Sequence, residues 1–335
     1  MSRGCARGNL AKFCDFFPRP EHGFLRCVGA YTERGQRDKR KLMQVVLHTG
    51  LHATDSDRLF KTLLRNRDGF KASGVAVPGP GKYRQLISEM LNALGDARPA
   101  PGSRDILLDS ILDDAADHVD RMILSHENLF SVPKIAFQGG MVYRKAEQRL
   151  RVLQEIFAGD SIEIFIGLRN PATFLPALLA ATPLGTLSEV LHGLDPMQIR
   201  WSRLIARITE AVPGVPVTVW CDEDSPLVWG ELVREFAGLE PTHPIIGAYS
   251  RMADITSQEG MTRFRAYLAE KPDLNEVQIR RVMVAFLDKY ADASKVEHEC
   301  DIPDWDADLV QDLTDQYEED LFEIGRMPSV TLIAP

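Results

Sequence analysis

Short apolar runs alternate with longer amphipathic segments from residue 43 to near the end of the chain. The strongest apolar run covers residues 162–168, and a shorter run rich in β-branched residues covers residues 44–47. Neither run alternates apolar and polar positions, so both predict strands that are buried on both faces of a sheet. Further short runs predict strands at residues 74–77, 121–124 and 215–220.

The segments between these strands place apolar residues three and four positions apart, which predicts helices with one buried face. Pro171 opens one such segment, and the others lie at residues 55–67, 83–94, 105–118, 146–157, 197–211, 227–236, 257–269, 275–290 and 306–322. Short buried strands separated by helices are typical of an α/β fold whose parallel sheet is covered on both faces. We therefore expect a three-layer α/β protein with extra helices in its C-terminal part.

The first 42 residues differ in composition from the rest of the chain. They hold ten Lys and Arg against four Asp and Glu, and they show neither strand nor helix periodicity. We expect a poorly ordered basic extension, which translation from Met43 would omit, followed by a single α/β domain over residues 43–335. An ordered accessory segment and a basic arm that binds an acidic partner are the alternatives.

Charge and composition exclude several classes of protein. The net charge is −9, so the part after residue 42 carries −15 and lacks the excess of cations that nucleic-acid binding requires. The longest notable apolar run, residues 174–181, has eight residues, too few to span a membrane. The five cysteines lack metal-site spacing, and no signal-peptide pattern is present. We therefore expect a cytoplasmic protein with reduced thiols, no metal and no nucleic-acid partner.

A candidate anion site lies where the strand at residues 44–47 leads into the next helix. The connecting residues include His48, Gly50, Thr54 and Ser56. Backbone N–H groups at the start of a helix have no partner within the helix and therefore attract anions. The segment is thus of the strand–loop–helix type that binds phosphate groups.

Two further motifs follow predicted core strands. Arg169 opens an Arg-Asn-Pro motif after residues 162–168, and His126 and Glu127 belong to a Ser-His-Glu-Asn-Leu motif after residues 121–124. Ligands of open α/β sheets bind at the carboxyl ends of strands, so Arg169 is a candidate anion clamp, and we expect it to lie on the same sheet edge as Gly50. His126 and Glu127 are candidate general bases. The alternatives are a structural ion pair for Arg169, a surface position for His126 and a capped turn for Glu127.

Together these motifs resemble those of the bacterial sulfotransferase-like family, whose first strand and loop read approximately H-I-G-x-x-K-T-G-T-T and whose later strands end in S-x-E-x-L and R-(D/N)-P. The resemblance covers about residues 43–290. It implies a P-loop fold, 3′-phosphoadenosine 5′-phosphosulfate as the donor, and a carbohydrate or other small-molecule hydroxyl acceptor. The roles it implies are donor contacts for His48, Gly50, Thr54 and Ser56, a 3′-phosphate contact for Arg169, and proton abstraction for His126 or Glu127.

Four positions depart from the family pattern at the donor site. The loop Lys aligns with Ala53, the loop Gly with Asp55, the second Thr with Asp57 and the clamp Ser with Ala177. A carboxylate roughly 4 Å from a phosphate costs about 4 kcal/mol at an effective dielectric near 20, which is on the order of 10³ in affinity. Asp55 at a helix N-cap would also accept the N–H groups that the phosphate needs. We therefore expect weak or absent donor binding.

An active sulfotransferase that transfers sulfonate to a hydroxyl acceptor is the alternative. It needs a cation in place of the missing loop Lys. His52, if protonated, and Arg58, one turn into the predicted helix, are the candidates.

The C-terminal region is strongly acidic. Residues 297–323 hold 12 Asp and Glu and no Lys or Arg. Residues 304–308 imitate the start of a calcium loop, but Leu309 and Asp315 stand where such loops need Gly and Glu. Apolar residues at every fourth position predict instead an amphipathic helix at about residues 305–323. Its acidic face is expected to be solvated, with a basic partner as the alternative.

Overall fold

The computed structural model describes residues 41–54, 57–112, 118–296, 302–303 and 305–335. The expectation of a poorly ordered extension over residues 1–42 therefore lies almost wholly outside the described residues. Within these ranges, no helix combines the length and the apolar composition that crossing a membrane requires.

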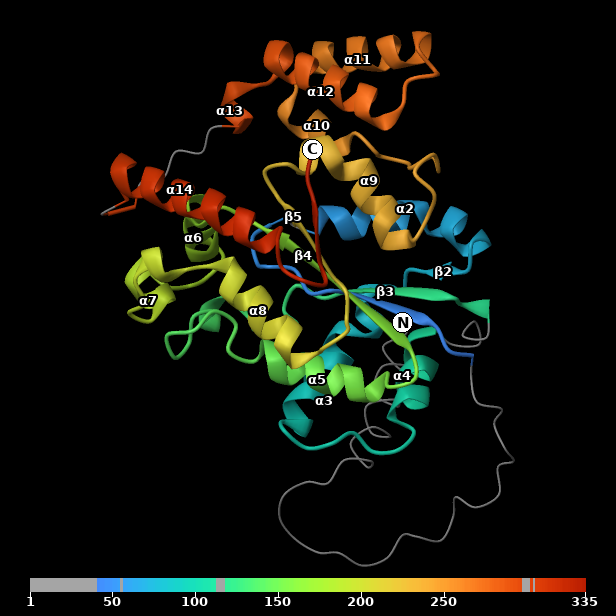
Figure 1. Ribbon diagram of the computed structural model, residues 1–335, viewed down its shortest axis with the longest axis vertical. Helices are drawn as coiled ribbons and strands as arrows, with labels where there is room; N and C mark the ends of the chain where they lie inside the picture. Colours follow the sequence, from blue (N-terminus) through green and yellow to red (C-terminus); the bar gives the residue numbers. More distant parts are fainter. Residues whose placement is uncertain (1–40, 55–56, 113–117, 297–301, 304) are drawn as a thin grey trace, which may run out of the picture.

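A parallel sheet forms the centre of the protein (Figure 1). Within the described residues it has six strands in the order β2-β3-β1-β4-β5-β6, and each neighbouring pair is parallel. The strands are β1 (Gln44–His48), β2 (Val75–Ala76), β3 (Arg121–Ser125), β4 (Ser161–Leu168), β5 (Val217–Cys221) and β6 (Val330–Ile333). The expected α/β fold is confirmed, and β6 is an edge strand that the sequence pattern did not predict.

Helices cover both faces of this sheet. Their bounds are α2 (Arg58–Ala72), α3 (Arg84–Leu94), α4 (Ser103–Leu112), α5 (Ala146–Ile156), α6 (Pro171–Ala180), α7 (Leu187–Leu191), α8 (Trp201–Ala211), α9 (Ser225–Ala237), α10 (Ser250–Ile255), α11 (Gln258–Glu270), α12 (Glu276–Tyr290), α13 (Ala293–Val296) and α14 (Ala307–Ile324). Short 3-10 turns lie at Pro80–Lys82, Pro133–Ile135 and Pro196–Gln198.

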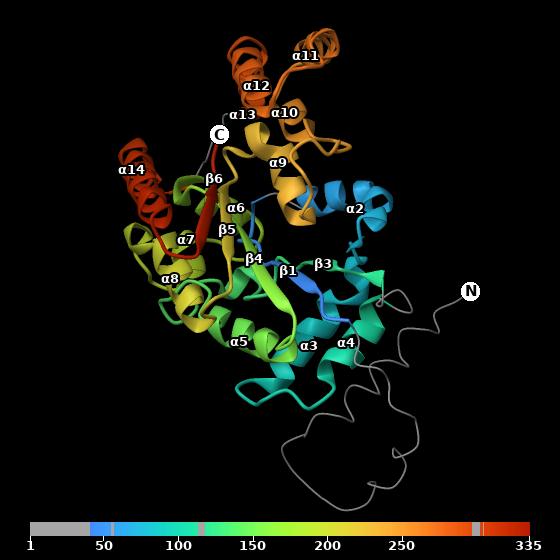
Figure 2. The ribbon, with the colours of Figure 1, turned by 45° about the vertical axis from the view of Figure 1, so that its right-hand side comes forward.

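The two faces of β1 belong to two different cores. Val45 and Leu47 pack in a cluster with residues of α3, α4, α5, α6 and α8, whereas Val46 packs with residues of α2 and α9. Figure 2 shows these two groups of helices on opposite sides of the strands. Because successive side chains of a strand point to opposite faces, an uninterrupted apolar run fits this position between two layers.

Some helix boundaries differ from those predicted. The helix predicted at residues 55–67 is α2, which begins at Arg58. The helix predicted at residues 197–211 begins at Trp201, because Ile199 and Arg200 are extended. In both cases the helix starts later than the apolar periodicity alone suggests.

The predicted acidic helix is α14, and it packs its apolar stripe on the body of the protein. Its N-cap is Asp306, whose side chain accepts a hydrogen bond from Leu309 N at 2.8 Å. Leu313 and Tyr317 are buried, as the four-residue repeat predicts. Asp320, 2% exposed, is an acid of this helix that faces inward.

Helices α10 to α13 lie beyond α9, on the side away from the sheet (Figures 1 and 2). Helices α10, α11 and α12 contribute the residues of a third buried cluster, namely Met252, Met261, Phe264 and Met283. The sheet and this small helical layer thus meet along α9.

Candidate functional site

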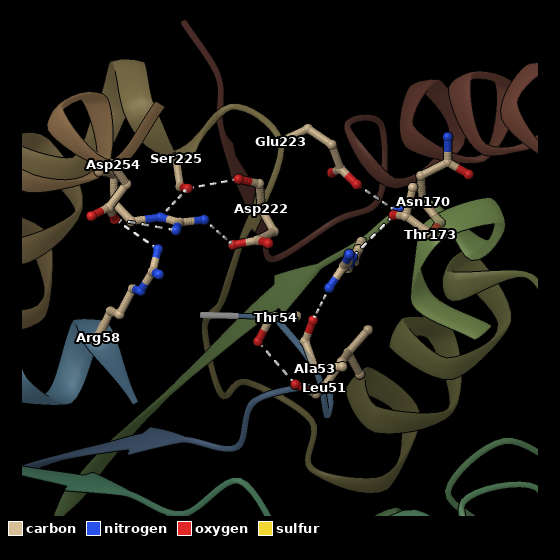
Figure 3. A network of polar contacts seen from close by, with 12 residues as sticks. Leu51, Ala53, Thr54, Arg58, Asn170, Thr173, Asp222, Glu223, Ser225 and Asp254 are labelled. Carbon is tan, nitrogen blue, oxygen red and sulfur yellow. Dashed lines mark hydrogen bonds and ion pairs between the residues drawn. The ribbon is translucent and has the colours of Figure 1, made fainter. Parts of the chain in front are cut away.

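The carboxyl ends of β1, β3, β4 and β5 lie at one edge of the sheet. The strands β1 and β4 are parallel, with His48 opposite Phe165. The prediction that Gly50 and Arg169 share an edge is confirmed, because Arg169 Nη1 donates a hydrogen bond to the carbonyl oxygen of Ala53 (Figure 3). The candidate site is therefore assembled at the edge where ligands of open α/β sheets bind.

The loop that follows β1 makes several of its contacts within the protein. Thr49 N donates to Phe165 O at 3.1 Å, and Thr54 Oγ1 donates to Leu51 O at 2.9 Å. Gly50 has a φ of +27°, a region that favours glycine. The Thr54 hydroxyl is thus bound to its own loop, whereas Ser56 lies outside the described residues.

Arg169 joins the end of β4 to the loop that follows β1. Its Nε donates to Thr173 Oγ1 at 3.0 Å, while Nη1 binds Ala53 O. The indole Nε1 of Trp201 donates to the carbonyl oxygen of Arg169 at 2.8 Å, which fixes the backbone from the other side. The role of Arg169 as a 3′-phosphate clamp stays a prediction, and a ligand there would compete with the Ala53 carbonyl.

Asp57, rather than Asp55, occupies the N-cap position of α2. Its φ is 63°, and its side chain makes no capping hydrogen bond among the described residues. Instead, Asp57 Oδ1 accepts from Arg84 Nη2 at 2.8 Å. Arg84 also donates from Nε to Ser125 O at 2.8 Å. Asp55 itself lies outside the described residues. Because the N-cap is Asp57, the residue directly before Arg58, the expectation that Asp55 caps this helix is wrong.

Arg58 points away from the loop, toward α10 (Figure 3). Its Nη1 donates to Asp254 Oδ2 at 2.7 Å, and Arg251 Nη1 lies 3.7 Å from the same oxygen. Arg251 also contacts Asp222 Oδ1 at 3.2 Å and Ser225 Oγ at 3.0 Å. This chain of charges joins α2, α10 and the end of β5. Sequence reasoning missed Asp222, although its place directly after a core strand was a usable signal.

A second polar chain joins the end of β4 to α14. Asn170 N donates to Glu223 Oε1 at 2.8 Å, and Asn170 Nδ2 donates to Thr314 Oγ1 at 3.0 Å. Tyr317 Oη donates to Glu223 Oε2 at 3.3 Å. The Asn of the Arg-Asn-Pro motif therefore anchors the C-terminal helix, a role that the linear sequence did not reveal.

His48 lies inside the fold, where it is 4% exposed. Its Nδ1 is 2.9 Å from Ser125 Oγ. Its ring centroid lies 5.7 Å from that of Trp220 and 5.4 Å from that of Phe236. Its predicted donor contact stays a prediction, and the geometry supports a role in joining β1 to β3.

His126 and Glu127 differ in their access to solvent. His126 is 5% exposed, and its Nε2 lies 2.8 Å from Ser88 Oγ. Burial, together with the nearby Arg84 guanidinium, lowers the pKa of His126 to about 4. Glu127 is half-buried and lies beside the loop, with its backbone close to Gly50. Of the two candidate bases, Glu127 is therefore the one that solvent reaches.

His52 cannot replace the missing Lys as a cation. It is 3% exposed, and its Nδ1 lies 2.9 Å from Tyr143 Oη. Its Nε2 lies 3.1 Å from Asn128 Oδ1 and 3.0 Å from Ser131 O. Burial lowers the pKa of His52 despite these two contacts, which raise it. The imidazole is therefore neutral near pH 7 and serves to join the loop to the segment after β3.

Comparison with known proteins leaves the family open. No family model matches the chain, and neither the curated proteins nor the solved structures gave a match. Among the described residues, no cluster of three or more His, Cys, Asp or Glu has the arrangement of a metal site.

Proposed function

We propose that the chain is a sulfotransferase-like protein whose loop binds 3′-phosphoadenosine 5′-phosphosulfate weakly or not at all, and that the fold serves as a binding or scaffold module in the cytoplasm. The observation that carries the proposal is the bond from Arg169 to the Ala53 carbonyl. Because of this bond, the guanidinium that the resemblance assigns to the donor phosphate already has a partner within the protein.

The charges around the loop support the same proposal. Arg84 is paired with Asp57 at 2.8 Å, and Arg58 with Asp254 at 2.7 Å. A phosphate group would have to separate such a pair, or else bind beside a carboxylate that repels it. Because these side chains are partly exposed, each pair is worth less than a buried one. The absence of the loop cation and the presence of these acids together still disfavour binding of the donor.

The test is calorimetry with 3′-phosphoadenosine 5′-phosphate on the full chain and on the triple variant Ala53→Lys, Asp55→Gly, Asp57→Thr. The parent is expected to show no binding at millimolar ligand. The variant is expected to create or strengthen binding, because it adds one cation, removes two acids and releases Arg84 from Asp57. Ala53 already has a φ of 56°, so Lys there adds little backbone strain.

Two controls make this test decisive. Thermal denaturation of the variant shows whether it is folded, and the further change Arg84→Gln should abolish the part of the binding that is gained by releasing Arg84 from Asp57. Micromolar binding by the parent, not improved in the variant, would contradict the proposal. It would favour the active sulfotransferase, for which the position of Glu127 beside Gly50 is the supporting observation.

A further inference from the structure

A cavity of about 730 Å³ lies on the outer side of α9, away from the sheet edge described above. Its walls come from α9, from the segment that follows α9, and from the first half of α12. Trp229, Val233 and Phe236 of α9 face the sheet core, whereas Glu231 and Arg234 line the cavity. One face of α9 therefore packs in the core of the protein, and the other face lines the cavity.

The most buried charge of this cavity is Arg234, which is 8% exposed. Its Nη2 is paired with Glu276 Oε1, and its Nη1 donates a long hydrogen bond of 3.4 Å to His243 O. Burial lowers the pKa of this guanidinium. A buried guanidinium offers five N–H donors, and an incoming acidic group would satisfy them well.

The acid that pairs with Arg234 is Glu276, and its side chain has room to move toward solvent. The Glu276 side chain is 38% exposed and stands in the first turn of α12. A second ion pair, Arg280 Nη2 to Glu231 Oε2 at 2.5 Å, also bridges α9 and α12. An anion could therefore displace the Glu276 carboxylate toward solvent while the other bridge keeps the helices together. The amino end of α12, at the same place, favours negative charge.

The rest of the lining is largely apolar. Leu227, Ile245, Leu274 and Met283 contribute side chains, and Tyr249 adds a phenol. A concave, mostly apolar site of several hundred Å³ with one or two placed polar groups has the dimensions of a small-molecule site.

We propose that this cavity binds a small amphipathic organic acid, whose acidic group pairs with Arg234 and whose apolar body lies against Leu227, Ile245 and Met283. The site is separate from the sheet edge and does not depend on the function proposed for that edge.

The probe is 8-anilinonaphthalene-1-sulfonate, which carries one acidic group on aromatic rings, and binding is measured by calorimetry on the full chain. One saturable site per chain is expected. Glu276→Gln should tighten binding about five- to tenfold, because it removes the acid that competes for Arg234. Arg234→Gln should weaken binding about tenfold or more.

Two valines of α12 provide a matched pair of variants. Val277 is 57% exposed and lines the cavity, whereas Val284 is 50% exposed on the same helix and is not part of the lining. Val277→Phe should narrow the cavity and weaken binding about fivefold or more, and Val284→Phe should leave it unchanged.

Circular dichroism and thermal denaturation check that each variant is folded. Absence of binding by the parent at millimolar probe would overturn the proposal. So would equal effects of the two valine variants, or binding that Glu276→Gln does not tighten, since either result indicates adsorption to exposed apolar surface.

Discussion

At the scale of single residues, arginines near the sheet edge bind acceptor groups of the protein itself. Arg169 binds the loop carbonyl of Ala53, Arg84 binds Asp57, and Arg58 binds Asp254. Each of these residues has the chemistry of an anion ligand, but each has a partner supplied by a distant part of the chain. The residue type alone therefore does not decide between a ligand contact and a structural contact.

Histidine burial gives a prediction about pH. The folded-state pKa of His126 is about 4, against 6.5 for the ordinary side chain. The unfolded chain thus binds a proton at a higher pH than the folded chain does, so folding stability should fall as the pH decreases from about 6.5 toward about 4. At about 1.4 kcal/mol per pKa unit, the loss approaches about 3 kcal/mol.

Urea denaturation at pH 7, 5 and 4 measures this loss. His126→Gln should remove it, so that the variant depends less steeply on pH than the parent. His192→Gln, at an exposed histidine, is the control and should keep the parent's pH dependence. Identical pH dependence of the parent and of His126→Gln would show that His126 does not titrate as the structure indicates.

At the scale of secondary-structure elements, α14 stabilises a helix distant from it in the sequence. Asp320 accepts hydrogen bonds from Trp201 N at 2.5 Å and from Ser202 N at 3.2 Å, at the start of α8. Arg200, the N-cap of α8, makes no side-chain capping bond among the described residues. Asp320 therefore accepts hydrogen bonds from the first N–H groups of α8, as the side chain of an N-cap residue does in other helices.

Asp320→Ala should destabilise the fold by about 1–3 kcal/mol, because it leaves buried backbone N–H groups without their acceptor. Glu319→Ala is a matched control, since that side chain is 75% exposed and lies 3.8 Å from Arg200. The control should change stability by less than about 0.5 kcal/mol. Urea denaturation midpoints compare the two, and equal midpoints would contradict the proposed capping role.

At the scale of the whole molecule, the charge is unevenly distributed. The first 42 residues carry an excess of Lys and Arg, while the exposed face of α14 carries acids. This segment contacts the body through Lys41, whose carbonyl oxygen accepts a hydrogen bond from Arg104 Nη2 at 3.1 Å. The ammonium group of Lys41 also pairs with Asp120, and these two side chains are 53% and 60% exposed. An exposed pair of this kind contributes little to stability.

A chain that begins at Met43 should therefore melt within about 2 °C of the full chain, since a loss below about 0.5 kcal/mol produces a shift of that order. A chain that begins at Lys41 is the control, because it keeps the Lys41 contact and removes only the preceding residues. Calorimetric melting compares the three proteins. A drop of more than a few degrees in both shortened chains would show that the first 40 residues pack on the body.

The sequence by itself determined the parallel α/β fold and the common edge of Gly50 and Arg169. Buried apolar runs and helical periodicity are local signals, and parallel strands bring their carboxyl ends together whatever their order in the sheet. Only the tertiary structure decided which partners the polar residues take. The pairs Arg58–Asp254 and Asp320–Trp201 join residues far apart in the chain, and no local pattern encodes such contacts. The edge strand β6 and the cavity between α9 and α12 likewise depend on how elements pack against one another, since packing sets both the pairing of a short strand and the space left between two helices.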